Sequence, residues 1–309
     1  MTVRRALILA LAVLAAPVAA APARAASSGS ATTRVTLKSP GAAPRSPLRL
    51  TLASGSTTGA TMEFSESVDQ SLNGTPTNSV HLPPIRFVLH TKLASVAANG
   101  SAPIDYSYSD VSVVDDGSVS AAQRTQLESA LAPITALAGS GTLTSRNQLL
   151  DSKLTGTEKL DPSVAQLTDQ FSDQVGAVTV PFPREAVGVG AKWRGVSTLR
   201  VSGINTTQTY DYTLRSRDGN VAVFDFTYTQ TAPHQPVTLP GVPKNAKLTI
   251  SRYRISGSGS ITVDLTQPLP AMGTTHASGT QAFLLRAQGE HGTLTQKVTA
   301  GVDVSSAPG

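Results

Sequence analysis

The sequence predicts a mainly β protein of the α+β type: an antiparallel curved sheet or half-barrel with two amphipathic helices packed on one face. Apolar and polar residues alternate with period two over most of the chain. Turn pairs such as Asn73-Gly74 and Asp218-Gly219 separate these stretches, as expected for hairpins. Only two stretches have helical spacing, and the βαβ alternation of a parallel nucleotide-binding sheet does not occur.

The N-terminus has the pattern of a secretory signal peptide. Arg4 and Arg5 precede an uncharged stretch over 6–21, and Ala23 to Ala25 supply the small residues of a cleavage site. A transmembrane helix needs about 20 strongly apolar residues, whereas this stretch is mostly alanine and contains Pro17. We therefore expect cleavage after the last of these alanines. The protein should be exported by the general secretory route, rather than as a twin-arginine substrate, and be secreted or held in the cell envelope.

Composition narrows the possible partners. The chain has no cysteine, so it has neither a disulfide framework nor a lipobox cysteine for acylation. We expect no stable membrane anchor after signal cleavage. Loss of Arg4, Arg5 and Arg24 leaves 22 basic and 20 acidic residues, which lowers the formal net charge from +5 to +2. Basic residues are scattered and do not form a stripe with interleaved aromatics, so we expect no nucleic-acid partner.

Four segments are expected along the chain. After the signal peptide (1–25), residues 26–47 are rich in Ser, Ala, Thr, Gly and Pro and are predicted to form a disordered leader. A β-rich domain should cover 48–304, beginning with the alternating Leu48, Leu50 and Leu52. It could be one continuous sheet or two similar halves, 48–176 and 177–304. Residues 305–309 are expected to be a tail.

A first helix is predicted after Ser120. This residue and Gln123 form a capping box, which marks a helix N-terminus. Apolar residues then follow along one face, and Pro133 should kink the helix before Gly139 ends it. The residues of this face are Leu127, Leu131, Ile134 and Leu137.

A second helix is predicted from Asp161 to Gly176. Asp161 is a favourable N-cap, and Pro162 suits the first helical position. Its apolar residues are Val164, Leu167, Phe171 and Val175. Because each helix has one apolar face, we expect both to pack on the same face of the sheet.

No catalytic or metal site is recognisable from residue spacing. The five histidines lie far apart, and none has helical ligand spacing from another histidine or a carboxylate. They are His81, His90, His234, His276 and His291. Gly257 to Ser260 lacks the spacing of a nucleophile elbow and is predicted to form a bulge or bend in a strand pair. We expect no cofactor and no catalytic residues.

The stretch from Pro183 to Trp193 is the most distinctive in the chain. Pro183, Val187, Gly190 and Trp193 belong to a pattern Pro-x3-Val-x-Val-Gly-x2-Trp, in which the sole tryptophan should anchor a hairpin in the core. The pattern resembles an uncharacterised family of exported bacterial proteins, a domain of unknown function, and this resemblance implies no catalytic residues. The order of strands and helices is also similar to that of LolA and LprG type lipid carriers, whose open half-barrel shelters acyl chains.

The leading functional hypothesis is a non-catalytic binding or carrier module for a lipid or other apolar ligand. Phe224, Phe226 and Tyr228 share one face of a predicted strand, and Phe171 of the second helix could complete the ligand site. Two alternatives stay open. One is a cell-wall or protein-interaction module with an envelope protein as partner, and the other is a secreted hydrolase with dispersed site residues.

Overall fold

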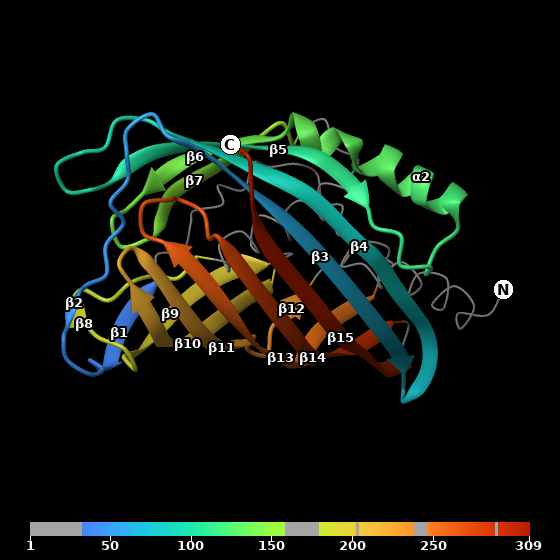
Figure 1. Cartoon of the computed structure of the whole chain (residues 1–309). Coiled ribbons are helices and arrows are strands. Elements are labelled where there is room, and N and C mark those ends of the chain that lie inside the picture. The colour runs from blue at the N-terminus through green and yellow to red at the C-terminus, as the bar shows by residue number, and fades with distance from the viewer. Residues whose placement is uncertain (1–32, 158–178, 202–203, 238–245, 288–289) are drawn as a thin grey trace.

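Thirteen strands form one antiparallel sheet in the part of the chain that the structure describes (Figure 1). The computed structural model describes residues 33–157, 179–201, 204–237, 246–287 and 290–309. The strands of this sheet are β1 (Arg34–Ser39), β3 (Thr57–Leu72), β4 (Thr75–Leu93), β5 (Ala102–Val113), β6 (Ala138–Leu143), β7 (Leu149–Thr155), β9 (Lys192–Val201), β10 (Ile204–Asp218), β11 (Val221–Thr231), β12 (Pro236–Val237), β13 (Lys247–Asp264), β14 (Met272–Ala287) and β15 (Glu290–Ala307).

The predicted fold class is confirmed, and the sheet is continuous. Its strand order is β1-β9-β10-β11-β13-β14-β15-β3-β4-β5-β6-β7, with β12 beside β13. The two parts of the chain meet where β15 pairs with β3 along fourteen residues. The strands of 48–176 and 177–304 therefore build one sheet, which curves around an inner face (Figure 1). The two-residue strands β2 (Ser46–Pro47) and β8 (Ala186–Val187) form a small separate pair.

The ordered sheet begins earlier than the sequence predicts. Arg34–Ser39, within the expected leader, form β1 and pair with β9. Val35 and Leu37 alternate with polar residues and pack against the core, a short signal that the surrounding Ser, Ala and Pro residues obscure. At the other end, β15 continues to Ala307, so the expected tail is largely strand. Leu48 and Leu50 are buried outside any strand, where their backbone crosses the end of the sheet.

The helix α2 (Ala121–Leu131) protects a sheet margin. Its capping box is present as predicted, and the α-helix gives way to a 3-10 helix, η1 (Ala132–Ala136), at Pro133. β6 pairs with β5 only from Ala102 to Ser107, and α2 and η1 cover the remainder of β5 (Figure 1). The Glu128 Oε1 accepts a hydrogen bond from the Val113 N–H at 3.2 Å. The second helix, predicted over 161–176, lies outside the described residues.

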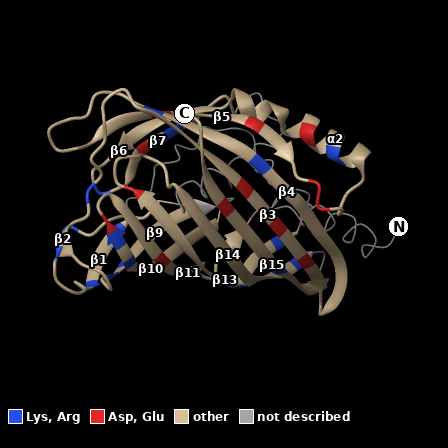
Figure 2. Cartoon of the chain, viewed as in Figure 1, with Lys and Arg blue, Asp and Glu red and all other residues tan. Residues whose placement is uncertain are grey.

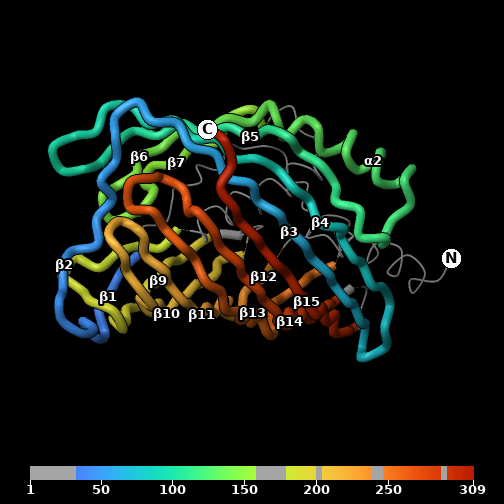
Figure 3. Tube along the Cα trace, in the orientation of Figure 1, coloured from blue at the N-terminus to red at the C-terminus, as the bar shows by residue number. Residues whose placement is uncertain are grey.

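A short segment links the two edges of the sheet at one end. The Phe182 N–H donates to the Arg146 carbonyl at 2.9 Å, and the Trp193 Nε1–H donates to the Pro181 carbonyl at 2.9 Å. The Gln148 Nε2 also donates to the Thr33 carbonyl, beside β1. The edge strands β1 and β7 are therefore joined through loops and side chains without pairing. Figure 3 shows β1 and the β6–β7 hairpin at the same end of the molecule.

The glycines of β13 differ from their predicted role. The strand runs without interruption through Gly257 and Gly259, and its register shifts instead between Ile250 and Arg252. A Cβ at Gly257 would lie 2.5 Å from a Tyr228 ring carbon, and one at Gly259 would lie 2.6 Å from a Phe226 ring carbon. These glycines therefore make room for rings on the neighbouring strand β11, and they do not bend the chain.

Candidate functional site

The Pro183 to Trp193 motif lies at the end of the sheet where the segment around Phe182 links the two edges. Trp193 is 1% exposed, stacks on Tyr212 at 5.7 Å between ring centroids and meets Phe224 edge-on at 5.8 Å. Val187 is buried in the same cluster, and Gly190 has a φ of 82°, which suits glycine at this turn. The motif therefore contributes to the packing of the core.

The predicted ligand-binding rings are mostly occupied by packing. Phe224 is 0% exposed and Phe226 3%, and both lie among aromatic neighbours. These two rings have almost no surface left for a ligand. Tyr228 differs, because it is only partly buried and lies at the margin of the cluster. Phe171 lies outside the described residues.

A row of glutamines crosses the inner face of the sheet. The direct register pairs Gln70 of β3 with Gln296 of β15, and Gln296 with Gln281 of β14. Further along the sheet, Gln230 of β11 pairs with Gln208 of β10. We call these five residues the glutamine belt. Strand alternation places all of them on the side that carries the core.

Part of the glutamine belt is bonded and part is not. Tyr253 of β13 bridges the gap between Gln281 and Gln230, pairing with the first and donating its hydroxyl to the Oε1 of the second at 3.4 Å. The Gln230 Nε2 donates to the Thr206 hydroxyl. Gln70 is 2% exposed, yet within the described part of the chain neither its Oε1 nor its Nε2 has a hydrogen-bond partner. A buried amide without partners is uncommon in native proteins.

A row of small residues on the same face separates Glu66 from Tyr228. The register runs from Glu66 to Ala300, Ala277, Gly257 and Tyr228 on five neighbouring strands. Burial raises the pKa of the Glu66 carboxyl to about 7 and that of the Tyr228 hydroxyl to about 12. The inner face therefore has a row of small residues, with the Glu66 carboxyl group at one end and the Tyr228 phenol at the other.

Sequence reasoning missed these residues, although a signal for them exists. In β3, Glu66 and Gln70 occur at the same strand parity as Met62, Phe64 and Val68. The alternation predicts apolar residues at these positions. Polar residues found there instead indicate a functional strand face.

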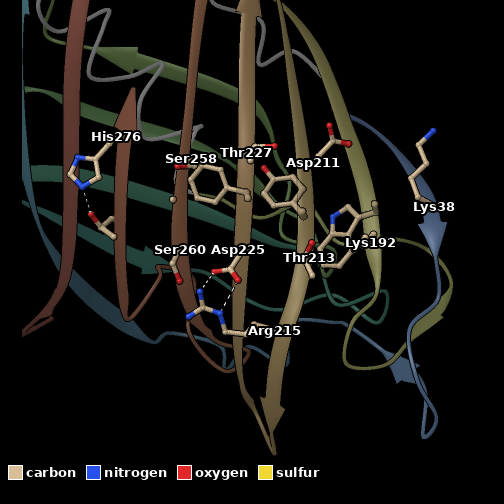
Figure 4. Close-up of a pocket in the computed structure, with 15 residues that line it drawn as sticks. Lys38, Lys192, Asp211, Thr213, Arg215, Asp225, Thr227, Ser258, Ser260 and His276 are labelled. Atoms are coloured by element: carbon tan, nitrogen blue, oxygen red, sulfur yellow. Dashed lines mark hydrogen bonds and ion pairs between the residues drawn. The ribbon is translucent and has the colours of Figure 1, made fainter. Parts of the chain in front are cut away.

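The outer face of the sheet has a depression of about 670 Å³, which lies over β9, β10, β11, β13 and β14. Figure 4 shows the polar side chains of this depression. Arg215 and Asp225 form an ion pair, and the His276 Nε2 lies 3.5 Å from the Thr274 hydroxyl. Asp225 is thus engaged by an arginine and His276 by a hydroxyl, so the two do not form an acid–base pair. Among the described residues, no group of three metal-ligating side chains occurs, and no helix is long and apolar enough to span a membrane.

Comparisons with known proteins give little. No family model matches this chain, and no curated protein matches it. Among solved structures, the chain has a weak likeness to "TodX monoaromatic hydrocarbon channel deltaS2 mutant". The two are 11% identical, and the match covers 82% of this chain and 90% of that chain with a TM-score of 0.18. A score this low carries no argument about fold or function.

Proposed function

We propose that this chain is an exported, non-catalytic binding protein that holds an amphiphilic, largely apolar ligand against the inner face of its sheet. The observation that carries the proposal is the buried Gln70 amide, which has no hydrogen-bond partner among the residues that the structure describes. Export rests on the N-terminal signal pattern. Binding rests on the geometry of the inner face.

The energetic argument starts from the cost of Gln70. A buried amide without partners destabilises a fold by about 1–3 kcal/mol, and an apolar residue at this position would avoid that cost. Gln70 is as buried as Phe226, so a ligand reaches its amide only when neighbouring side chains move aside. A ligand that then offers a hydroxyl, carbonyl or amide group would satisfy the amide and recover much of this cost. Functional positions are where a sequence commonly departs from the choice that is best for stability.

The neighbours of Gln70 define the rest of the ligand. Leu72 and Leu294 lie on one side of the glutamine belt, and Val68 and Val298 lie on the other. A molecule on this face would thus meet hydrogen-bonding groups along one line and apolar side chains beside it. The small side chains of Ala300 and Ala277, next to the Tyr228 ring over Gly257, offer the low relief that a bulky apolar group needs. A lipid-like molecule with a hydrogen-bonding group has this combination.

The test compares ligand retention with stability. Purified protein is extracted with organic solvent, and the extract is analysed by mass spectrometry. We expect a lipid-like molecule to copurify with the unsubstituted protein, and Gln70→Leu to retain at least about tenfold less, which is 1.4 kcal/mol of binding free energy. After delipidation, Gln70→Leu should be the more stable protein by about 1–3 kcal/mol in urea unfolding.

Gln126→Leu is the matched control, because Gln126 is exposed on α2, outside the inner face. It should retain ligand as the unsubstituted protein does. The proposal fails if no molecule copurifies and none of a set of fatty acids and phospholipids binds. It also fails if Gln70→Leu and Gln126→Leu retain ligand equally.

A further inference from the structure

Five arginines gather at the end of the sheet next to β2 and β8. We call this region the arginine end; it comprises Arg45, Arg49, Arg146, Arg184 and Arg217. Figure 2 shows that Lys and Arg concentrate at this end of the molecule. The Arg49 guanidinium donates to the Pro183 and Arg184 carbonyls, and the Arg217 Nη1 donates to the Ser46 hydroxyl at 2.7 Å. The strands and loops that carry these residues are therefore in contact.

The arginine end has an excess of positive charge that the described residues leave unpaired. Arg45, Arg49 and Arg217 donate to carbonyl and hydroxyl oxygens. Among the residues that the structure describes, no ion pair joins any of the five arginines to a carboxylate. Glu185, Asp218 and Asp264 lie on the same loops and strand ends, so five positive charges face three negative ones, a net of +2. Guanidinium groups bind phosphate through two parallel hydrogen bonds.

Exposed apolar side chains lie at the same end of the sheet as these arginines. Val189 is 47% exposed, and its carbonyl accepts from the Ala42 N–H in the loop that precedes Arg45. Val221 is 43% exposed at the β10–β11 turn, and Met272 is 63% exposed at the start of β14, after the β13–β14 loop. Among the described residues, these are three of the four large apolar side chains that stand exposed.

We propose that the arginine end docks on a membrane surface that carries anionic phosphate headgroups. A soluble polyanion would need only the positive charges, whereas a membrane interface also accommodates exposed apolar side chains between them. The glutamine belt lies toward the opposite ends of the strands, near the β3–β4 hairpin. Docking therefore does not depend on the proposed inner-face ligand, and each can be tested without the other.

The experiment measures vesicle binding by cosedimentation, using protein purified after export from an expressing bacterium. Vesicles of phosphatidylcholine alone are compared with vesicles that also contain phosphatidylglycerol. We expect binding only to the anionic vesicles, with a decrease at higher salt. The triple substitution Arg45→Gln, Arg146→Gln and Arg217→Gln should weaken it at least about tenfold, by removing charge that the anionic surface attracts. Arg49 is left intact because its guanidinium holds the Pro183 and Arg184 carbonyls of the segment that leads into β8.

The control removes the same charge elsewhere, with Lys247→Gln, Arg286→Gln and Lys297→Gln, all exposed and far from β2 and β8. It should bind within about twofold of the unsubstituted protein. Val189→Ser with Val221→Ser tests the apolar contribution and should reduce the binding that persists at high salt. Circular dichroism and Trp193 fluorescence verify folding. Equal losses in the two charge triples, or binding to soluble polyphosphate without binding to vesicles, would overturn the proposal.

Discussion

Glu66 and Gln70 are polar residues in the buried face of β3. Their neighbours at the same strand parity, Phe64 and Val68, are apolar and buried. Both polar side chains lower the stability of the ligand-free protein, one by an unpaired amide and the other by a carboxyl group whose ionised form is poorly solvated. At these two positions the sequence keeps polar groups on the inner face at a cost in stability, which is consistent with the proposed ligand site.

The raised pKa of Glu66 predicts how stability depends on pH. Burial moves the carboxyl from its usual value near 4.5 to about 7. Between these values the folded state holds a proton that the unfolded state has lost, so stability falls as pH rises through this window. The total loss is about 3 kcal/mol and is complete above the folded pKa. Glu66→Gln should therefore raise stability at pH 8 by up to that amount and have little effect at pH 4.

Urea unfolding of both proteins across this pH range measures the difference. Glu63→Gln is the control, since Glu63 lies on the outer face of β3 and pairs with Arg86 at 2.8 Å. It should leave the decline between pH 4.5 and pH 7 in place. A decline that persists unchanged in Glu66→Gln would assign the pH dependence to another group.

At the scale of elements, α2 acts as a cover for an incomplete strand pair. On the edge that faces away from β4, β6 pairs only with the first half of β5. Along the second half, α2 and η1 take the place of a neighbouring strand. Leu131 and Ile134 are buried in the same apolar cluster as inner-face residues of β3 and β4. Unpaired strand margins favour association between chains, and a covering helix prevents this.

The Glu128 carboxylate links the helix to this margin. Replacing Glu128 with alanine removes the acceptor of the Val113 N–H and should lower stability by about 1 kcal/mol. Hydrogen exchange at the Val113 amide should accelerate more than at amides in the centre of the sheet. Gln126→Ala, two residues earlier on the exposed face of α2, should leave that exchange unchanged. Equal exchange in both variants would show that this hydrogen bond contributes nothing.

Local signals in the sequence predict elements well and their partners poorly. The Ser120 capping box and the Asp218-Gly219 turn each depend on a few adjacent residues, and both occur as predicted. The strand β1 was missed because two apolar residues in a stretch rich in serine, alanine and proline are a weak signal. The burial of Glu66 could not be predicted, because it depends on strands more than two hundred residues apart in sequence.

At the scale of the whole molecule, the core joins residues from both parts of the chain. One cluster contains Leu93 and Ile104 together with Trp193 and Phe224. A single continuous sheet was one of two arrangements that the sequence allowed, and β15 pairing with β3 decides between them. The segment around Phe182 adds a second link, because its hydrogen bonds join the loop before β7 to Trp193 of β9. Among its described residues, the chain from Arg34 to Ala307 therefore has no boundary at which few contacts cross.

This continuity predicts that the two parts of the chain unfold together. Trp193 reports on the second part, and it is the only tryptophan. Phe87 is 3% exposed in the cluster of β3, β4 and β5, so Phe87→Trp with Trp193→Phe creates a reporter for the first part. In urea, the fluorescence transition of each protein should coincide with its own transition by circular dichroism, as two-state unfolding requires. Separate midpoints would show that the sheet divides between β15 and β3 and that each part is stable by itself.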